Sequence, residues 1–420
     1  MASELDVVGA GGGAAAVERS SSTVGDSEAG PRAIGRRVLW VLGVLAALGV
    51  AAGAVAWKEG HHALGTTAEM PWGLLIATYV FFVVSSTGLC LVSSLGHVFG
   101  VKLFEPLATR AILLALVTLL VGFAVMSAEL EHPVLLLRMV LLSPNPASPI
   151  WWMGTLYGLY MVFIGAELFF LLRHDHRRAR AAGILGIVAA VSAHSNLGAV
   201  FGLSHARPYW YGPFLPVYFI ASALLCGAAL LVLVVYLEDW FTNDRKLRAE
   251  NEPLVAALGK LLALFLFVVL FFTAWKIIAG VAGGHHGKVE VTMAMLSGPL
   301  FLSFWFFEVF LAFVVPLTIL LGARGRRPGW IAVAAALPML AVFVMRYNFV
   351  VAGQMLSLKP VVGARDELVR YGPPFKGNPA GFLPYTPSLV EVGIVVGAIA
   401  AAVLLFVVGT RTLKLRQEEA

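Results

Sequence analysis

Ten stretches of about 20 predominantly apolar residues follow one another along this 420-residue chain. A helix of roughly 20 residues, rising about 1.5 Å per residue, crosses the roughly 30 Å hydrocarbon core of a bilayer. Charged residues make up only 13% of the chain, against roughly 25% in soluble domains. The sequence excludes a soluble enzyme and predicts an all-α integral membrane fold with helices at about 38–57, 73–98, 107–128, 150–172, 181–204, 213–237, 254–281, 293–322, 329–350 and 389–409.

The basic residues predict an orientation for these helices. A cytoplasmic N-terminus places 20 of the 30 lysines and arginines on the cytoplasmic side, in agreement with the positive-inside rule. This sidedness accounts for the formal charge of +6 without a nucleic-acid partner. We predict a multi-pass protein of the bacterial inner membrane with both termini in the cytoplasm.

The chain is predicted to divide into segments at the ends of its helices. Its first 35 residues are small and polar, which is typical of a disordered tail. The next apolar stretch exceeds the roughly 7–15 residues of a signal-peptide core, so an uncleaved helix is favoured over a cleaved signal. The predicted segments are the cytoplasmic tail 1–35, a peripheral helix 36–60, two four-helix bundles at 71–210 and 211–350, a periplasmic loop 351–388, and a peripheral tenth helix with a cytoplasmic tail at 389–420.

An internal repeat suggests the two bundles. One constant separation in sequence relates three pairs of like residues: Tyr79 and Tyr218, Gly88 and Gly227, Arg207 and Arg346. A separation of four helices preserves the direction of each helix, so the repeat would be parallel, about an axis along the membrane normal. Glu167 and Glu308 are separated by nearly the same distance, so each bundle is expected to hold a buried carboxylate.

Ionisable residues at membrane depth are costly and therefore point to function. Glu167, His194, Glu308 and Glu391 are the candidates for a proton path, and Lys276 and Arg346 lie near the outer helix ends. The alternative is structural: each side chain could instead hydrogen-bond a neighbouring helix. For Glu391, at the start of the last helix, interaction with the helix dipole is the default interpretation.

The densest group of polar and aromatic residues follows the third helix, from Glu129 through Glu131 and His132 to Arg138. Trp151, Trp152, Tyr157 and Tyr160 come next in the chain. Aromatic walls with His, Tyr or Arg donors suit a quinone, a planar apolar molecule with two carbonyl oxygens, and carboxylates could exchange its protons. The alternative for the aromatic residues is an ordinary belt at the membrane interface.

Two cysteines, Cys90 and Cys226, lie inside apolar segments. An iron–sulfur cluster needs about four thiolates, so we expect no cluster in this chain. His61-His62 and His285-His286 are adjacent pairs without supporting carboxylate spacing, which favours solvated loops over metal sites. Because His194 is the only central histidine, we also expect no haem.

Several stretches together resemble the NrfD/PsrC family, whose members are polysulfide-reductase-type membrane subunits, and in particular its HybB-like ten-helix branch. They are PWGLLIATYVFFVVSSTG (71–88), ELEHPVLLLRMVLLSPNPASPIWWMGTLYGLY (129–160), SHARPYWYGPFLPVYFIASALLCGAAL (204–230), SFWFFEVFLAFVVPL (303–317), RYNFVVAGQ (346–354) and YTPSLVEVGIVVG (385–397).

The resemblance implies two parallel four-helix bundles and no cofactor within the subunit. It implies a ferredoxin-like iron–sulfur subunit on the periplasmic face, which connects to a hydrogenase, a molybdopterin enzyme or a multihaem cytochrome. It also implies a quinone near the outer surface of the first bundle, held here by Tyr79, Glu129, His132, Arg138, Trp152, Tyr157 and Arg207. Many members have Asp-Leu-Gly-Arg-Pro where this chain has Glu129-Leu130-Glu131-His132-Pro133, so an imidazole would replace a guanidinium.

The sequence thus predicts a membrane subunit that exchanges electrons between a periplasmic iron–sulfur partner and menaquinone or ubiquinone, active only with its partner subunits. Proton translocation through the buried ionisable residues would be an additional function. Two alternatives remain open. A secondary transporter would bind its substrate at mid-membrane, and a structural anchor would hold a redox complex on the membrane without touching quinone.

Overall fold

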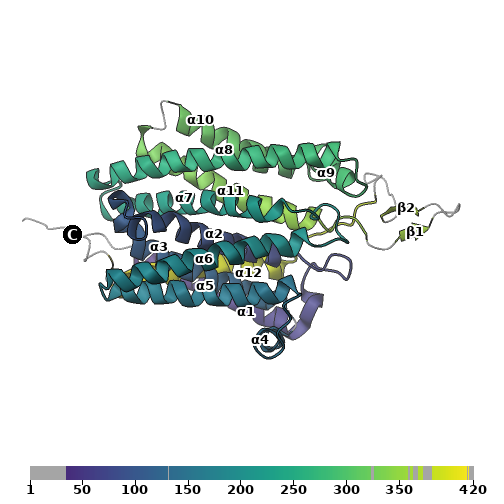
Figure 1. The fold of residues 1–420 in the computed structure, drawn as a ribbon, viewed down its shortest axis with the longest axis horizontal. Coiled ribbons are helices and arrows are strands. Elements are labelled where there is room, and N and C mark those ends of the chain that lie inside the picture. The colour runs from purple at the N-terminus through teal and green to yellow at the C-terminus, as the bar shows by residue number, and fades with distance from the viewer. Residues whose placement is uncertain are drawn as a thin grey trace, which may run out of the picture.

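The computed structural model describes residues 35–130, 132–322, 326–357, 360–362, 368–371, 381–413 and 415. Long helices run side by side along the long axis of the molecule (Figure 1). In this described part of the chain, ten helical segments are long and apolar enough to cross a membrane. The prediction of an all-α integral membrane fold is confirmed. Residues 1–34 of the predicted tail, the parts 358–359, 363–367 and 372–380 of the predicted 351–388 loop, and Glu131 lie outside the described residues.

The spanning helices begin and end close to the predicted positions. We call the end of the fold where α2 begins the outer end, following the predicted orientation. The spanning helices are α1 (Arg36–Glu59), α2 (Leu74–His97), α3 (Ala108–Glu129), α5 (Pro149–Leu172), α6 (His176–Gly202), α7 (Leu215–Thr242), α8 (Glu252–Ala282), a π-helix (Ser303–Val314) that continues as α10 (Val315–Leu321), α11 (Pro328–Ala352) and α12 (Leu389–Thr412).

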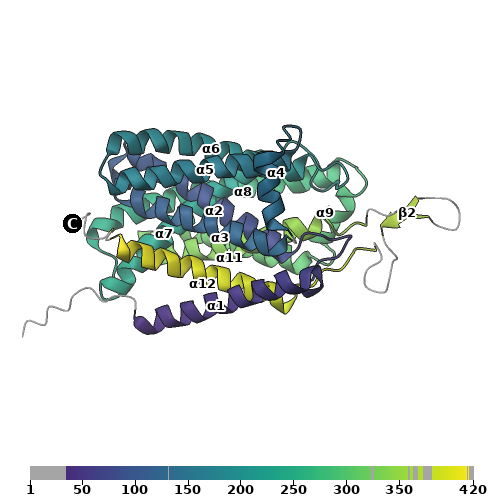
Figure 2. The same ribbon diagram turned by 90° about the horizontal axis from the view of Figure 1, so that it is seen from below.

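Shorter elements connect the spanning helices. They are α4 (Pro133–Leu142), α9 (Lys288–Leu296), the 3-10 helices Gly60–Ala63, Lys102–Leu107 and Ala249–Asn251, and the strands β1 (Pro360–Val362) and β2 (Leu368–Tyr371), which pair antiparallel. The strands and α9 lie at the outer end, and α4 lies there across the direction of the spanning helices (Figure 2). The apolar side chains of α4 that are more than half exposed suit a helix at the membrane interface: Val134, Leu135, Leu137, Met139, Leu141 and Leu142.

The prediction of one continuous helix is wrong. The stretch 293–322 was expected to be continuous, but α9 ends at Leu296 and the next spanning segment includes a π-helix from Ser303 to Val314. Gly298 and Pro299 lie in the break, where glycine and proline both disfavour a continuing helix. A π-helix is rare and frequently occurs at functional sites, and this one carries Glu308.

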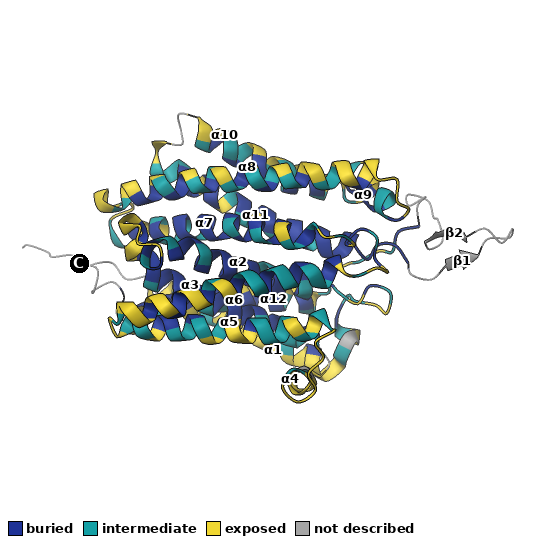
Figure 3. Cartoon of the chain, viewed as in Figure 1, coloured by how far each residue is buried: buried dark blue, intermediate teal, exposed yellow. Residues whose placement is uncertain are grey.

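The centre of the fold is the contact between α2 and α7, which are buried along most of their length (Figure 3). A Cβ added to Gly88 of α2 would lie 1.8 Å from the carbonyl oxygen of Ala223, and one added to Gly227 of α7 would lie 2.1 Å from the carbonyl oxygen of Gly88. Small residues allow such close approach of helices in membranes. The sequence predicts that these two glycines are repeat equivalents, and a reciprocal contact is the arrangement expected of such a pair at a two-fold axis.

Tyr79 and Tyr218 lie near the outer ends of α2 and α7, but two other pairs suggested by a constant or nearly constant separation do not occupy equivalent places. Arg207 lies in the connection after α6, whereas Arg346 lies inside α11. Glu167 lies near the inner end of α5, whereas Glu308 lies in the outer half of its segment. Because the connections between helices differ in length, residues at equivalent places in two helix pairs need not be the same number of residues apart in the chain. We still propose two parallel bundles, on the helix order and the Gly88–Gly227 contact, but without these residue correspondences.

Candidate functional site at the outer end

A cavity of about 300 Å³ opens at the outer end, between the C-terminal ends of α1 and α3. Its lining mixes apolar side chains with ionisable groups. The lining includes Trp57, Lys58, Glu59, Ala128, Glu129 and His132. The structure therefore brings together Glu129 and His132, two members of the predicted quinone site.

The chain turn after α3 explains why these two residues meet. Leu130 leaves the helix with an extended backbone, at φ −84° and ψ 126°. Pro133 is the first residue of α4, and a residue before proline is disfavoured from helical geometry; accordingly His132 has φ −131° and ψ 69°. The sharp turn places the last side chain of α3 and the residue that precedes α4 on one cavity.

The Glu129 carboxylate is buried at the end of α3. Glu129 is only 5% exposed, and neither carboxylate oxygen has a hydrogen bond of good geometry among the described residues, although the backbone N–H of Gly73 interacts with the carboxylate. Buried polar groups nearly always have partners, because removing them from water without one is costly. A ligand donor or an exchanging proton would supply the missing interaction.

Arg138 and Trp152 lie outside the described lining of this cavity. Arg138 is exposed on α4. The indole nitrogen of Trp152 donates to the carbonyl oxygen of Pro146 at 2.8 Å, which closes the connection before α5. The family resemblance implied that both residues share one quinone site with Glu129, and the structure does not bring them together.

Arg207 holds outer connections together. Its guanidinium donates to the carbonyl oxygens of Glu69 at 2.8 Å, Leu356 at 2.9 Å and Gln354 at 3.3 Å. Burial lowers the pKa of Arg207, and the Glu69 carboxylate partly offsets this effect. Three carbonyl acceptors on two segments, Glu69 before α2 and Gln354 and Leu356 after α11, describe a structural clamp, whereas the resemblance implied that Arg207 lies near the quinone.

Tyr79 and Tyr157 belong to a second group, buried in the interior of α2, α3, α5 and α6. Their rings each meet Phe123 of α3 edge to face, with centroids 5.6 and 5.8 Å away. The Tyr157 hydroxyl is 3.2 Å from Nδ1 of His194, whose Nε2 is 3.2 Å from the carbonyl oxygen of Phe219. The Tyr79 hydroxyl has no hydrogen-bond partner among the described residues. This group lies roughly 8–12 Å below the outer helix ends, at about 1.5 Å per residue.

Further polar pairs continue from this group toward the inner end of the fold. Tyr160 of α5 donates to the carbonyl oxygen of Ser86 at 3.0 Å and is 3.1 Å from its hydroxyl. Near the inner end, Glu167 pairs with Nε2 of His97, the last residue of α2. Tyr157, Tyr160 and Glu167 are all buried, and their spacing puts them on one face of α5.

Glu308 belongs to a separate polar group in the other half of the fold. Its carboxylate is 3.5 Å from Nζ of Lys276 on α8 and accepts from Nδ2 of Asn348 on α11 at 3.2 Å. The Lys276 ammonium also lies over the rings of Tyr218 and Tyr209. Nearby, the buried Arg346 guanidinium lies over a phenylalanine ring. Glu308 is therefore a paired charge near the outer end.

Glu391 has the contacts of a helix cap. Its carboxylate accepts from the backbone nitrogens of Gly65 and Ser388, both at 2.8 Å, and from the Tyr385 hydroxyl at 2.5 Å. Burial and the hydrogen bond to Glu391 raise the pKa of Tyr385 well above its usual range, so the phenol stays protonated and donates. These contacts favour the helix-dipole alternative that the sequence left open.

Two residues of these polar groups were not predicted from the sequence. Trp57 lines the cavity, but a tryptophan at the outer end of an apolar helix is also typical of the interface belt. His97 pairs with Glu167, yet the two residues lie far apart in the chain. The position of His97 at the inner end of a predicted helix was the only available signal.

Comparison with known proteins decides the family. The family model described as "Polysulphide reductase, NrfD" matches residues 62–357. The chain belongs to this family. The resemblance drawn from the sequence is thereby confirmed, and this NrfD-family protein is a multi-pass membrane protein.

Relatives match over nearly the whole chain. A selenate reductase subunit of Mesobacillus selenatarsenatis is 25% identical, covering 87% of this chain and 91% of the relative. The "Hdr-like menaquinol oxidoreductase integral membrane subunit" of Archaeoglobus fulgidus is 26% identical, covering 90% and 93%. A putative dimethyl sulfoxide reductase membrane subunit of Halobacterium salinarum is 29% identical, covering 91% and 92%. These names describe subunits of reductase or oxidoreductase complexes and support a membrane redox subunit.

Proposed function

We propose that this NrfD-family protein is the quinone-reactive membrane subunit of a respiratory oxidoreductase complex. It exchanges electrons between an iron–sulfur subunit on its outer face and the quinone pool. The observation that carries the proposal is the buried carboxylate of Glu129, which has no hydrogen bond of good geometry in the described structure and lines one cavity with His132. The name of the Archaeoglobus relative, a menaquinol oxidoreductase subunit, favours menaquinone.

The residues of the cavity match what quinone chemistry needs. Reduction of the ring takes two electrons from the iron–sulfur partner and two protons, and oxidation of the quinol releases both. In the proposal, the His132 imidazole donates a hydrogen bond to one ring oxygen, and Glu129 transfers a proton to or from the other.

The electrons have to reach the cavity from a partner subunit. The chain has two cysteines, fewer than the roughly four thiolates that a cluster takes. Both are buried within helices, Cys90 in α2 and Cys226 in α7. The proposal therefore assigns the clusters to a ferredoxin-like protein docked at the outer end, close to Glu129, with a catalytic subunit beyond it.

Purification of the tagged protein from its native membrane tests this function. We expect an iron–sulfur partner to co-purify, together with extractable quinone. A partner without quinone would contradict quinone chemistry and favour the membrane anchor. Neither partner nor quinone would favour the transporter.

We also propose a proton path through the interior of α2, α5 and α6. Tyr157 with His194, Tyr160 with Ser86, and Glu167 with His97 form successive polar contacts toward the inner end. Tyr157 and Glu167 are about 15 Å apart along α5, at roughly 1.5 Å per residue, so water molecules or side-chain motion would have to complete the path. Glu308 and Glu391 are left out of this path, because their contacts lie at the outer end.

The change Glu167→Gln tests this path. Glutamine keeps the size of the side chain but cannot carry a proton, so we expect fewer protons moved per electron in proteoliposomes that contain the purified complex. Electron transfer to quinone should remain within about twofold, because Glu167 lies far from the cavity. A pH-sensitive dye measures the stoichiometry, and Glu250→Gln, at an exposed carboxylate, is the control. An unchanged stoichiometry would contradict the path.

A further inference from the structure

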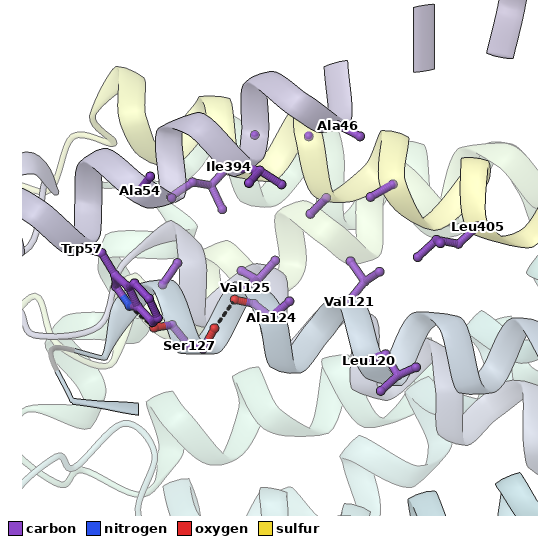
Figure 4. Close-up of a pocket in the computed structure, with 17 residues that line it drawn as sticks. Ala46, Ala54, Trp57, Leu120, Val121, Ala124, Val125, Ser127, Ile394 and Leu405 are labelled. Carbon is purple, nitrogen blue, oxygen red and sulfur yellow. Dashed lines mark hydrogen bonds between the residues drawn. The ribbon is translucent and has the colours of Figure 1, made fainter. Parts of the chain in front are cut away.

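A long apolar groove runs along the side of the fold between α1, α3 and α12. It encloses about 560 Å³, and Figure 4 shows Ala46 and Leu405 toward one end and Trp57 at the other. Ala46 and Trp57 bound it on α1, so it extends about 16 Å at roughly 1.5 Å per residue. That is about half of the roughly 30 Å hydrocarbon core. The groove is thus an elongated apolar site at membrane depth.

Small residues create the groove where α1 docks on α12. The two helices touch at Gly49 and Gly397, where a Cβ added to Gly49 would lie 2.6 Å from the Cα of Gly397. Along the same groove, Gly53 of α1 and Ala124 of α3 present little side chain. The close contact fixes the two peripheral helices against each other, and the small side chains leave the space beside them unfilled.

The groove and the polar cavity meet end to end. Trp57 and Ala128 line both of them. The Trp57 indole reaches from α1 to α3, where its nitrogen donates to the carbonyl oxygen of Ser127 at 3.3 Å (Figure 4). The combined site is an apolar groove open toward lipid that leads to a polar cavity with the buried Glu129 carboxylate.

We propose that this groove binds the isoprenoid tail of the quinone whose ring occupies the Glu129–His132 cavity. The inference rests on the proposed function and assigns the tail to α1 and α12, helices outside both proposed bundles. A quinone joins one polar ring to a long apolar tail, and the combined site has the same two parts in the same order. A phospholipid acyl chain would fit the groove alone, but its phosphate would then face the Glu59 and Glu129 carboxylates of the polar cavity.

The change Gly53→Leu fills the groove without disturbing the backbone. A Cβ at Gly53 meets nothing within 4 Å, so the leucine side chain has room to enter the groove. Ala124→Leu fills it from the opposite wall, where Ala124 is exposed. Gly43→Leu is the matched control, since Gly43 lies on the same helix, also has no atom within 4 Å of an added Cβ, and does not line the groove.

The experiment compares menaquinone with menadione, which has the same ring and no isoprenoid tail, in turnover by the purified complex. We expect Gly53→Leu and Ala124→Leu to raise the KM for menaquinone about tenfold, equivalent to about 1.4 kcal/mol, because the leucine side chain displaces part of the apolar tail from the groove. The KM for menadione should change less than about twofold, and Gly43→Leu should leave both unchanged.

Equal effects on the two quinones, or no effect on either, would overturn the assignment of the tail. Loss of a bound phospholipid from Gly53→Leu in native mass spectrometry, with an unchanged KM for menaquinone, would overturn it as well. Failure of the proposed function gives a different result, because the parent complex would then turn over neither menaquinone nor menadione.

Discussion

The change Gly88→Ala is expected to prevent this protein from accumulating in its folded form. The added methyl group would lie 1.8 Å from the carbonyl oxygen of Ala223 and 2.7 Å from the backbone nitrogen of Gly227. Because both obstacles are backbone atoms, α2 and α7 would have to separate along the centre of the fold. We expect a destabilisation of about 3 kcal/mol, a large part of a typical stability of roughly 5–15 kcal/mol.

Size-exclusion chromatography of a fluorescent fusion in detergent measures this effect, together with the thermal stability of any folded fraction. Gly43→Ala is the matched control: its Cβ meets nothing within 4 Å, and alanine favours a helix over glycine by roughly 0.5–1 kcal/mol, so this variant should be as stable as the parent or slightly more so. Equal stability of Gly88→Ala and the parent would show that the two helices do not meet at Gly88.

The second large effect is expected from Glu129→Gln, in the outer cavity. Glutamine keeps the shape of the side chain and its capacity for hydrogen bonds, but it cannot exchange a proton with the quinone. We expect quinone-dependent turnover to fall about 100-fold, at the lower end of general acid–base contributions. Turnover of the catalytic partner with a soluble dye should stay unchanged, because the dye bypasses the membrane subunit.

Turnover of menaquinol by the intact complex, at saturating quinol, measures this loss. Glu59→Gln is the matched control, since Glu59 lines the same cavity but is exposed and should retain activity within about twofold. Activity of Glu129→Gln close to that of the parent would show that Glu129 does not exchange protons with the quinone.

The helices of this fold could be predicted from sequence because the thickness of a bilayer dictates their length. The predicted 150–172 and 389–409 stretches correspond closely to α5 and α12. The break between α9 and the π-helix could not be seen in hydropathy, since the stretch 293–322 remains apolar throughout. Only Gly298 and Pro299 marked it, and both residues also occur inside membrane helices.

The candidate site was predictable only in part. Glu129 and His132 are neighbours in sequence, so one turn of the chain brings them together. Arg207 could not be assigned in the same way, because its acceptors lie on distant segments. The apolar groove could not be predicted either, since it forms only when α1 packs against α12 from the opposite end of the chain.

The most direct test of the central claim is photoaffinity labelling of the purified complex with an azido-quinone, followed by peptide mapping. We predict that the ring labels peptides that contain Glu129 and His132, and that excess menaquinone prevents this labelling. Labelling confined to a partner subunit, or to the polar group around Lys276 and Glu308, would contradict a quinone site between α1 and α3.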